Sequence, residues 1–307
     1  MTTILLGPQR FTITVDKTLR SLGLEGSVAM INSGWEEREG DDDELGGYLQ
    51  GRGDNLRLYH RLVDSLSKDR DFARAALRFR DRHDELRAFY GIRLQGAVET
   101  VAAVAHRTSV ESIGPVAHSA AIEAVRDVDR WYGEQLEQLH DEIATDAAEH
   151  SEVIGWHRSE VAGALDACAA VVIAGGDVRS LMRTLRLFDV RIPADKPVIA
   201  WSAGAMALTE QVVLFHDFAT HGVSASEVYD RGLGRVRGIV ALPHARRRLR
   251  LSDTDRMSLL ARRFPDQRLL LLDDGAVVRL DDDGPDLPSG SRTIGADGAV
   301  SVVEDAA

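Results

Sequence analysis

The sequence predicts an α/β fold with a mainly parallel sheet and a large helical insertion. Short, continuous apolar runs at residues 170–174 and 198–200 are typical of parallel strands buried on both faces. Each run is followed by a turn of small residues and then by a helical pattern, as in βαβ units. We therefore expect a single domain over residues 1–307, with residues 48–165 as a helical insertion between early strands.

The strands can be placed in order along the chain. The first is expected at residues 3–6 and the second at 27–31, with a helix around 17–22 between them. Later strands are expected at residues 212–215, 239–242, 269–272 and 276–280. The glycine-containing tail that follows predicts a small β-rich end or a loose terminus.

The insertion is expected to be helical because its composition and periodicity differ from the rest of the chain. Residues 55–107 are rich in Arg, Leu, Ala and Asp and contain no proline. Further on, apolar residues recur at intervals of three and four, which is the stripe of an amphipathic helix: Val125, Val128, Tyr132, Leu136, Leu139 and Ile143. Gly114 and Pro115 mark the expected break between the two helical stretches.

Composition argues against several classes of partner. The chain has 37 basic and 49 acidic residues, a net charge of −12, which disfavours nucleic acid and anionic membranes. The N-terminus lacks a signal-peptide pattern, and no apolar run reaches the length of a membrane span. Cys168 is the single cysteine, so no internal disulfide can form, and these features together predict a cytoplasmic protein.

Ser202 is the candidate nucleophile. A buried strand leads directly into Trp201-Ser202-Ala203-Gly204-Ala205, and such small residues allow a sharp turn that projects the hydroxyl from its crest. The following helix would direct its free N–H groups toward negative charge developing there. The alternative is a buried serine that only caps the helix.

A serine nucleophile needs a base, and the candidates are histidines at strand ends. His244 directly follows the strand at residues 239–242 and Pro243, and His216, which follows residues 212–215, is the second choice. Asp273 and Asp274 end another strand and could orient the histidine, although Asp-Asp-Gly is also a common hairpin turn.

The oxyanion of an acyl-transfer reaction also needs hydrogen-bond donors. The glycines at 175 and 176 follow a buried strand and could bring a backbone N–H close, with the N–H of Ala203 as the second donor. Neither a metal nor an organic cofactor is expected, because the sequence has no His/Cys cluster and no phosphate-binding loop.

In this order, these segments resemble the dipeptidase E and cyanophycinase family of serine peptidases. The matching segments are residues 171–176, which end in Gly-Gly, and residues 200–205, the Ser-Ala-Gly-Ala elbow. Pro243-His244 followed by arginines resembles the segment that holds the family's base, and residues 272–275 resemble its acid turn. The resemblance implies a flavodoxin-like, class I glutamine amidotransferase-like fold of three layers.

The resemblance also implies roles for individual residues. Ser202 would be the nucleophile, His244 the base and Asp274 the orienting acid, with Gly176 and Ala203 forming the oxyanion hole. The chain departs from the family pattern at Ala200, which replaces a glycine, at Ala245, which replaces an aromatic residue, and in the helical insertion.

The expected function is hydrolysis of small peptides or related amides through an acyl-serine intermediate. The family prefers acidic substrates, and Trp35, Arg247 and Arg248 are candidates for binding them. An α/β-hydrolase is disfavoured because no histidine follows Asp274, and a cysteine enzyme because Ser202 occupies the elbow while Cys168 precedes a strand. The other hypothesis is a non-catalytic protein that binds partners or self-associates through the insertion, for example as a homodimer.

Overall fold

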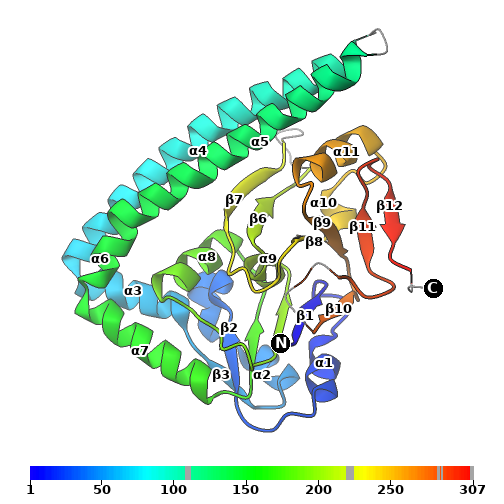
Figure 1. The fold of residues 1–307 in the computed structure, drawn as a ribbon. Helices are drawn as coiled ribbons and strands as arrows, with labels where there is room; N and C mark the ends of the chain where they lie inside the picture. The colour runs from blue at the N-terminus through cyan, green and yellow to red at the C-terminus, as the bar shows by residue number, and fades with distance from the viewer. Residues whose placement is uncertain (108–111, 219–224, 282–283, 285, 305–307) are drawn as a thin grey trace.

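The computed structural model describes residues 1–107, 112–218, 225–281, 284 and 286–304 (Figure 1). Its main sheet has the strand order β10-β1-β5-β4-β2-β3. The five neighbours β1, β5, β4, β2 and β3 are parallel, and β10 is antiparallel to β1. The strands of this sheet are β1 (Thr3–Leu6), β2 (Val28–Ile31), β3 (Gly53–Asn55), β4 (Ala170–Ile173), β5 (Val198–Trp201) and β10 (Val277–Leu280).

Helices cover both faces of this sheet. Side chains alternate between the two faces along each strand, and apolar residues point to both faces, so each face needs a covering layer. Ile4 and Leu6 of β1 belong to one buried cluster, together with residues of α1 (Val15–Ser21) and α2 (Asp43–Tyr48). Leu5 belongs to the other cluster, which includes residues of α8 (Val178–Leu187) and α9 (Ala203–Leu208). The predicted α/β fold with a mainly parallel sheet between helical layers is therefore confirmed.

Two smaller sheets complete the body. One has the order β12-β11-β9-β8 and the other pairs β6 with β7. Their strands are β6 (Gln211–Leu214), β7 (Glu227–Arg231), β8 (Ile239–Pro243), β9 (Arg268–Leu272), β11 (Arg292–Ile294) and β12 (Val300–Val302). The strands β11 and β12 form the small β-rich end, one of the two outcomes that the glycine-containing tail predicts.

The hairpin interpretation of Asp273-Asp274-Gly275 is wrong. A tight turn is present, since the N–H of Ala276 donates to the carbonyl of Asp273 at 3.0 Å. However, β9 pairs with β8 and β11, whereas β10 pairs with β1 in the main sheet. The turn therefore carries the chain from one sheet to the other.

The insertion lies between β3 and β4 and is helical, as expected. Its elements are α3 (Leu58–Lys68), α4 (Arg70–Ala105), α5 (Ile113–Leu139), a π-helical segment η2 (His140–Thr145), α6 (Asp146–Glu149) and α7 (Glu152–Ala167). The helices α4 and α5 pack side by side as a long hairpin whose far end projects beyond the body (Figure 1). The predicted range 48–165 also included β3, which pairs with β2 and so belongs to the sheet.

A buried ion pair joins this hairpin to the body. Arg263 of α11 (Thr254–Arg263) is 5% exposed and pairs with Asp129 of α5. The same guanidinium donates to the hydroxyl of Tyr90 on α4 at 2.8 Å, and Tyr90 donates to Asp129, also at 2.8 Å. Three separate elements are thus joined by one network of hydrogen bonds in a region with little access to water.

The remaining short helices are η1 (Ser33–Gly40) and α10 (Ala245–Arg248). Across the ranges given above, no helix combines the length and the apolar character that a membrane crossing requires.

Candidate active site

Ser202 occupies a strained turn between β5 and α9. Its backbone angles are φ 51° and ψ −119°, a region that residues other than glycine rarely adopt. Gly204 allows the turn to pack tightly, because a Cβ at this position would lie 2.3 Å from the carbonyl oxygen of Ile173 in β4. The first turn of α9 therefore approaches the sheet more closely than any residue with a side chain would allow.

The Ser202 hydroxyl does not cap the helix that follows it. No side-chain capping hydrogen bond is formed at this position; instead, the Ser202 Oγ lies 3.3 Å from the Nε2 of His244. This geometry argues against the cap interpretation, since a capping serine would accept hydrogen bonds from the first turn of the helix. The two side chains are close enough for proton transfer once a substrate tightens the contact.

His244 approaches Ser202 from a different sheet. It follows β8 with φ 57° and ψ 31°, the left-handed conformation, and its N–H donates to the carbonyl of Leu272 at 3.0 Å. The site therefore lies where the main sheet and the four-stranded sheet meet. His216, the second candidate base, is exposed after β6 and does not line the Ser202 groove.

The structure does not bring the candidate acids into hydrogen bonding with His244. The Asp274 carboxylate accepts from Arg247 at 2.8 Å, and that of Asp273 accepts from Arg292 at 2.7 Å. Within the described part of the chain, neither aspartate is hydrogen-bonded to the imidazole. Both nevertheless line a cavity of about 240 Å³ together with His244, so the choice between Asp274 and Asp273 stays a prediction.

The environment of His244 favours the neutral form of its imidazole. Burial lowers the pKa of His244, the positive charge of Arg248 lowers it further, and Asp274 acts in the opposite direction. A neutral imidazole can accept a proton from the Ser202 hydroxyl, as a general base must.

We expect serine reactivity to depend on pH accordingly. Only the neutral imidazole can act as base, so reactivity should be high above the pKa of His244 and fall as pH drops through it. The midpoint should lie below the ordinary value of 6.5. Replacing Arg248 with Ala should move the midpoint upward, because one positive charge is removed. A kcat/KM profile from pH 4.5 to 8.5 checks this, and a wild-type midpoint above 7 would contradict it.

The glycines after β4 line the same groove as Ser202 and His244. Gly176 has φ 131°, and a Cβ there would lie 2.3 Å from the carbonyl oxygen of Gly34. A Cβ on Gly175 would come within 2.9 Å of the Ser202 Cβ. Among the described residues, the Gly176 N–H has no hydrogen-bond partner, and Ala203, as the first residue of α9, has no intrahelical acceptor for its N–H. Both donors are thus available near Ser202.

A groove of about 470 Å³ leads to Ser202 and His244. Trp35 lines it, as the sequence predicted, whereas Arg247 and Arg248 do not; Arg247 lines the smaller cavity beside Asp274. The sequence interpretation missed several lining residues: Gln9, Arg10, Arg38, Glu44 and Tyr48. The rule that ligands gather beyond the carboxyl ends of strands could have found Gln9 and Arg10, which follow β1.

No group of three or more metal-ligating side chains with suitable geometry occurs among the residues that the structure describes. The groups gathered at the candidate site are a hydroxyl, an imidazole, backbone N–H groups and nearby carboxylates.

Comparison with known proteins finds a distant structural similarity but no matching family. No protein-family description matches the chain, and no curated protein matches it. Among solved structures, the crystal structure of a peptidase from an acI-B1 Actinobacterium aligns over 99% of this chain and 93% of that chain. The identity is 12% and the TM-score 0.43.

Proposed function

We propose that this protein is a serine-dependent hydrolase of small peptides or related amides. One observation supports the proposal most strongly: the Ser202 hydroxyl sits on a strained turn, leaves its helix uncapped and lies 3.3 Å from the imidazole of His244. Backbone strain of this kind persists only where surrounding packing imposes it, and it is concentrated at functional sites.

The proposed reaction passes through an acyl-serine intermediate. Neutral His244 removes the hydroxyl proton while the Ser202 oxygen attacks the substrate carbonyl. The N–H groups of Gly176 and Ala203 stabilise the oxyanion, and His244 then passes its proton to the leaving amine. Water, activated by the same imidazole, releases the acid product. Asp274 is the proposed orienting acid, and it would have to exchange its bond to Arg247 for one to His244.

We further propose that the substrate carries a carboxylate. Arg10 lines the groove and has no ion-pair partner among the described residues, although it lies over the ring of Phe11. Arg38, on the same groove, is already paired with Asp41 at 3.2 Å. A guanidinium without an ion-pair partner, in the groove that contains the candidate nucleophile, would bind a substrate carboxylate through two parallel hydrogen bonds. The resembled family's preference for acidic substrates agrees with this arrangement.

Hydrolysis of matched dipeptides tests the substrate class. We expect release of free amine from Asp-Leu and other dipeptides with N-terminal Asp, and slower release from Asn-Leu. Arg10→Ala should raise KM for Asp-Leu by about tenfold, the loss of one charge-assisted contact, and leave Asn-Leu nearly unchanged. Arg20→Ala, on the exposed side of α1, is the matched control. Equal losses on both peptides in Arg10→Ala would overturn the assignment of a carboxylate to this arginine.

A further inference from the structure

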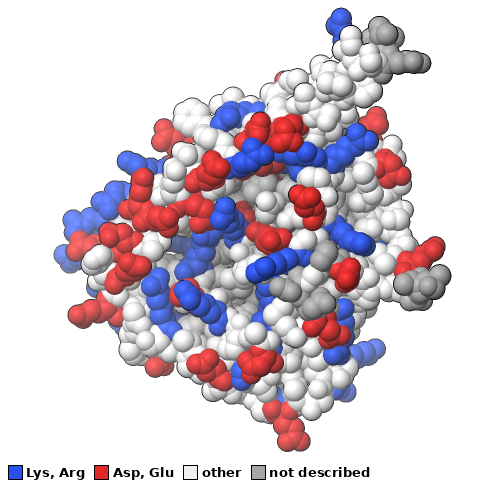
Figure 2. Space-filling view, viewed as in Figure 1, with Lys and Arg blue, Asp and Glu red and all other residues white. Residues whose placement is uncertain are grey.

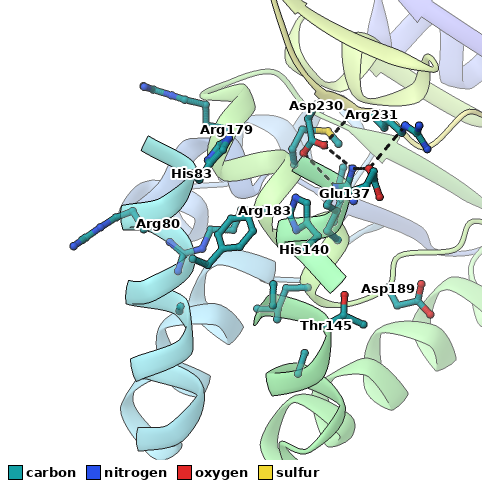
Figure 3. Close-up of a pocket in the computed structure, with 18 of the residues that line it drawn as sticks. Arg80, His83, Glu137, His140, Thr145, Arg179, Arg183, Asp189, Asp230 and Arg231 are labelled. Atoms are coloured by element: carbon teal, nitrogen blue, oxygen red, sulfur yellow. Dashed lines mark hydrogen bonds and ion pairs between the residues drawn. The ribbon is translucent and has the colours of Figure 1, made fainter. Parts of the chain in front are cut away.

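A second and larger cavity lies between the helical hairpin and the body. Its volume is about 690 Å³, and it shares no lining residue with the Ser202 groove. The walls come from α4, η2, α8 and the strand β7 (Figure 3). In the space-filling view, blue side chains gather around the hollow beneath the hairpin (Figure 2). The proposed hydrolysis gives this cavity no role.

The cavity concentrates positive charge in an acidic protein. The whole chain has a net charge of −12. Its lining nevertheless includes more arginines than carboxylates: Arg80, Arg87, Arg158, Arg179, Arg183, Arg186, Arg191 and Arg231 against Asp84, Glu137, Asp141, Asp189 and Asp230. A concave surface with an excess of one charge raises the local concentration of ligands of opposite charge.

One side of the cavity is already neutralised by its own ion pairs. Arg186 pairs with Asp230 of β7, which is 7% exposed, and with Glu137 at 2.9 Å. Arg231 extends this network toward Glu137 (Figure 3). These residues hold α5, α8 and β7 together, and we assign them a structural role.

The opposite side has arginines without matching acids in the cavity. Arg183 has no hydrogen-bond or ion-pair partner within the described part of the chain, and it is exposed to the cavity. Arg179 lies one turn earlier on the same face of α8, because residues four apart share a helix face. It pairs with Asp177, and Arg80 of α4 pairs with Asp81; neither carboxylate lines the cavity.

The pKa of Arg183 agrees with a positive charge that has no carboxylate partner in the cavity. Partial burial between the cavity walls lowers the pKa of its guanidinium. The hydroxyls of Tyr59 and Tyr229 act in the opposite direction, and the nearby Arg80 lowers the pKa further. A guanidinium next to a like charge, with no carboxylate in contact, is stabilised when an anion binds between the two.

Aromatic groups lie beside these arginines. The rings of Phe79 and His140 are 4.6 Å apart, and His83 is 5.6 Å from Phe79. Burial lowers the pKa of His83 to about 4 and that of His140 to about 3, so both imidazoles are neutral at pH 7. They offer ring surface and neutral hydrogen-bonding groups. His140 begins the π-helical segment, a geometry that is frequent at functional sites.

We infer that this cavity binds a small organic anion, with two or more charged oxygens on Arg183 and its neighbours and a ring packed against Phe79 and the histidines. Its volume lies within the range of small-molecule sites. Guanidinium groups bind phosphate and carboxylate oxygens in the same forked geometry, so both kinds of anion fit the chemistry.

Titration calorimetry at constant ionic strength tests this inference with three probes: AMP for an aromatic phosphate, phthalate for an aromatic dicarboxylate, and adenosine as the uncharged control. We expect AMP or phthalate to bind, which also identifies the preferred anion, and adenosine to bind at least tenfold more weakly than AMP if AMP is the ligand. Binding of neither anion to the wild type would overturn the inference.

Variants that each remove one arginine, inside or outside the cavity, show where the anion binds. Arg183→Ala should lower the affinity for whichever anion the wild type binds by about tenfold or more, and Arg80→Ala should lower this affinity as well. Arg74→Ala removes the same charge from an exposed position on α4 outside the cavity and should leave affinity unchanged. Undiminished affinity in a folded Arg183→Ala protein, or an equal loss in Arg74→Ala, would overturn the site; Arg183→Gln serves if the alanine variant does not fold. Since no hydrolysis is measured, the result is independent of the role of Ser202.

Discussion

Replacing Ser202 with Ala should reduce kcat/KM for the acidic dipeptide by at least about 10⁴-fold, because the attacking oxygen is removed while the groove stays intact. His244→Ala should produce a loss of similar size. The two residues act in one step, so the double variant should be little worse than either single variant. Steady-state release of free amine checks all three proteins.

Matched controls separate this result from a general loss of structure. His216→Ala removes the other histidine that follows a strand; it is exposed and lies outside the groove, so activity should be retained. Ser202→Gly should be as inactive as the alanine variant but more stable, because glycine adopts the positive φ at this position without strain. Full activity in Ser202→Ala, or loss of activity in His216→Ala alone, would contradict the assignment.

Arg263→Ala should lower the free energy of unfolding by about 3–5 kcal/mol, the typical result of removing one partner from a buried ion pair. The substitution leaves the Asp129 carboxylate without its cation and removes a donor from the Tyr90 hydroxyl. It also removes the hydrogen bond to the carbonyl of Ser226. Urea unfolding at pH 7, followed by circular dichroism, measures the change.

A double variant distinguishes an uncompensated charge from a simple loss of packing. Arg263→Leu combined with Asp129→Leu should be clearly more stable than Arg263→Ala, because no buried charge is left unpaired. Arg262→Ala, at the exposed neighbouring position, should cost less than about 1 kcal/mol. An Arg263→Ala protein as stable as the Arg262→Ala control would show that the network does not hold the hairpin to the body.

Much of the fold could be predicted because its buried strands consist of consecutive apolar residues. Residues 170–174 and 198–200 correspond to β4 and β5, and the apolar stripe from Val125 to Leu139 corresponds to the buried face of α5. Its last predicted member, Ile143, lies instead in η2 and is only half-buried. Such patterns are local, so a single sequence reveals them. The strand β3 was missed because Gly53–Asn55 is short and polar and pairs only at the sheet edge.

The candidate site was predictable only in part. Small residues around Ser202 indicate a turn, and Pro243-His244 follows an obvious strand, so both residues could be proposed from their neighbours. The sequence could not show that β8 and β9 leave the main sheet, because strand pairing depends on contacts distant in the chain. That change of sheet turns the expected hairpin at Asp273 into a crossing between sheets. The arginines of the second cavity come from α4, α7, α8, the segment after α8 and β7, and only the folded chain brings them together.

Mapping the site of a fluorophosphonate adduct by mass spectrometry tests the central claim most directly, since the probe forms a covalent bond only with an activated serine. We predict one adduct per chain, located on Ser202, and its disappearance in both Ser202→Ala and His244→Ala while circular dichroism shows an intact fold. An adduct that persists in Ser202→Ala, or that maps to another serine, would contradict the assignment. Absence of any adduct on the wild-type protein would instead favour a binding protein built on this fold.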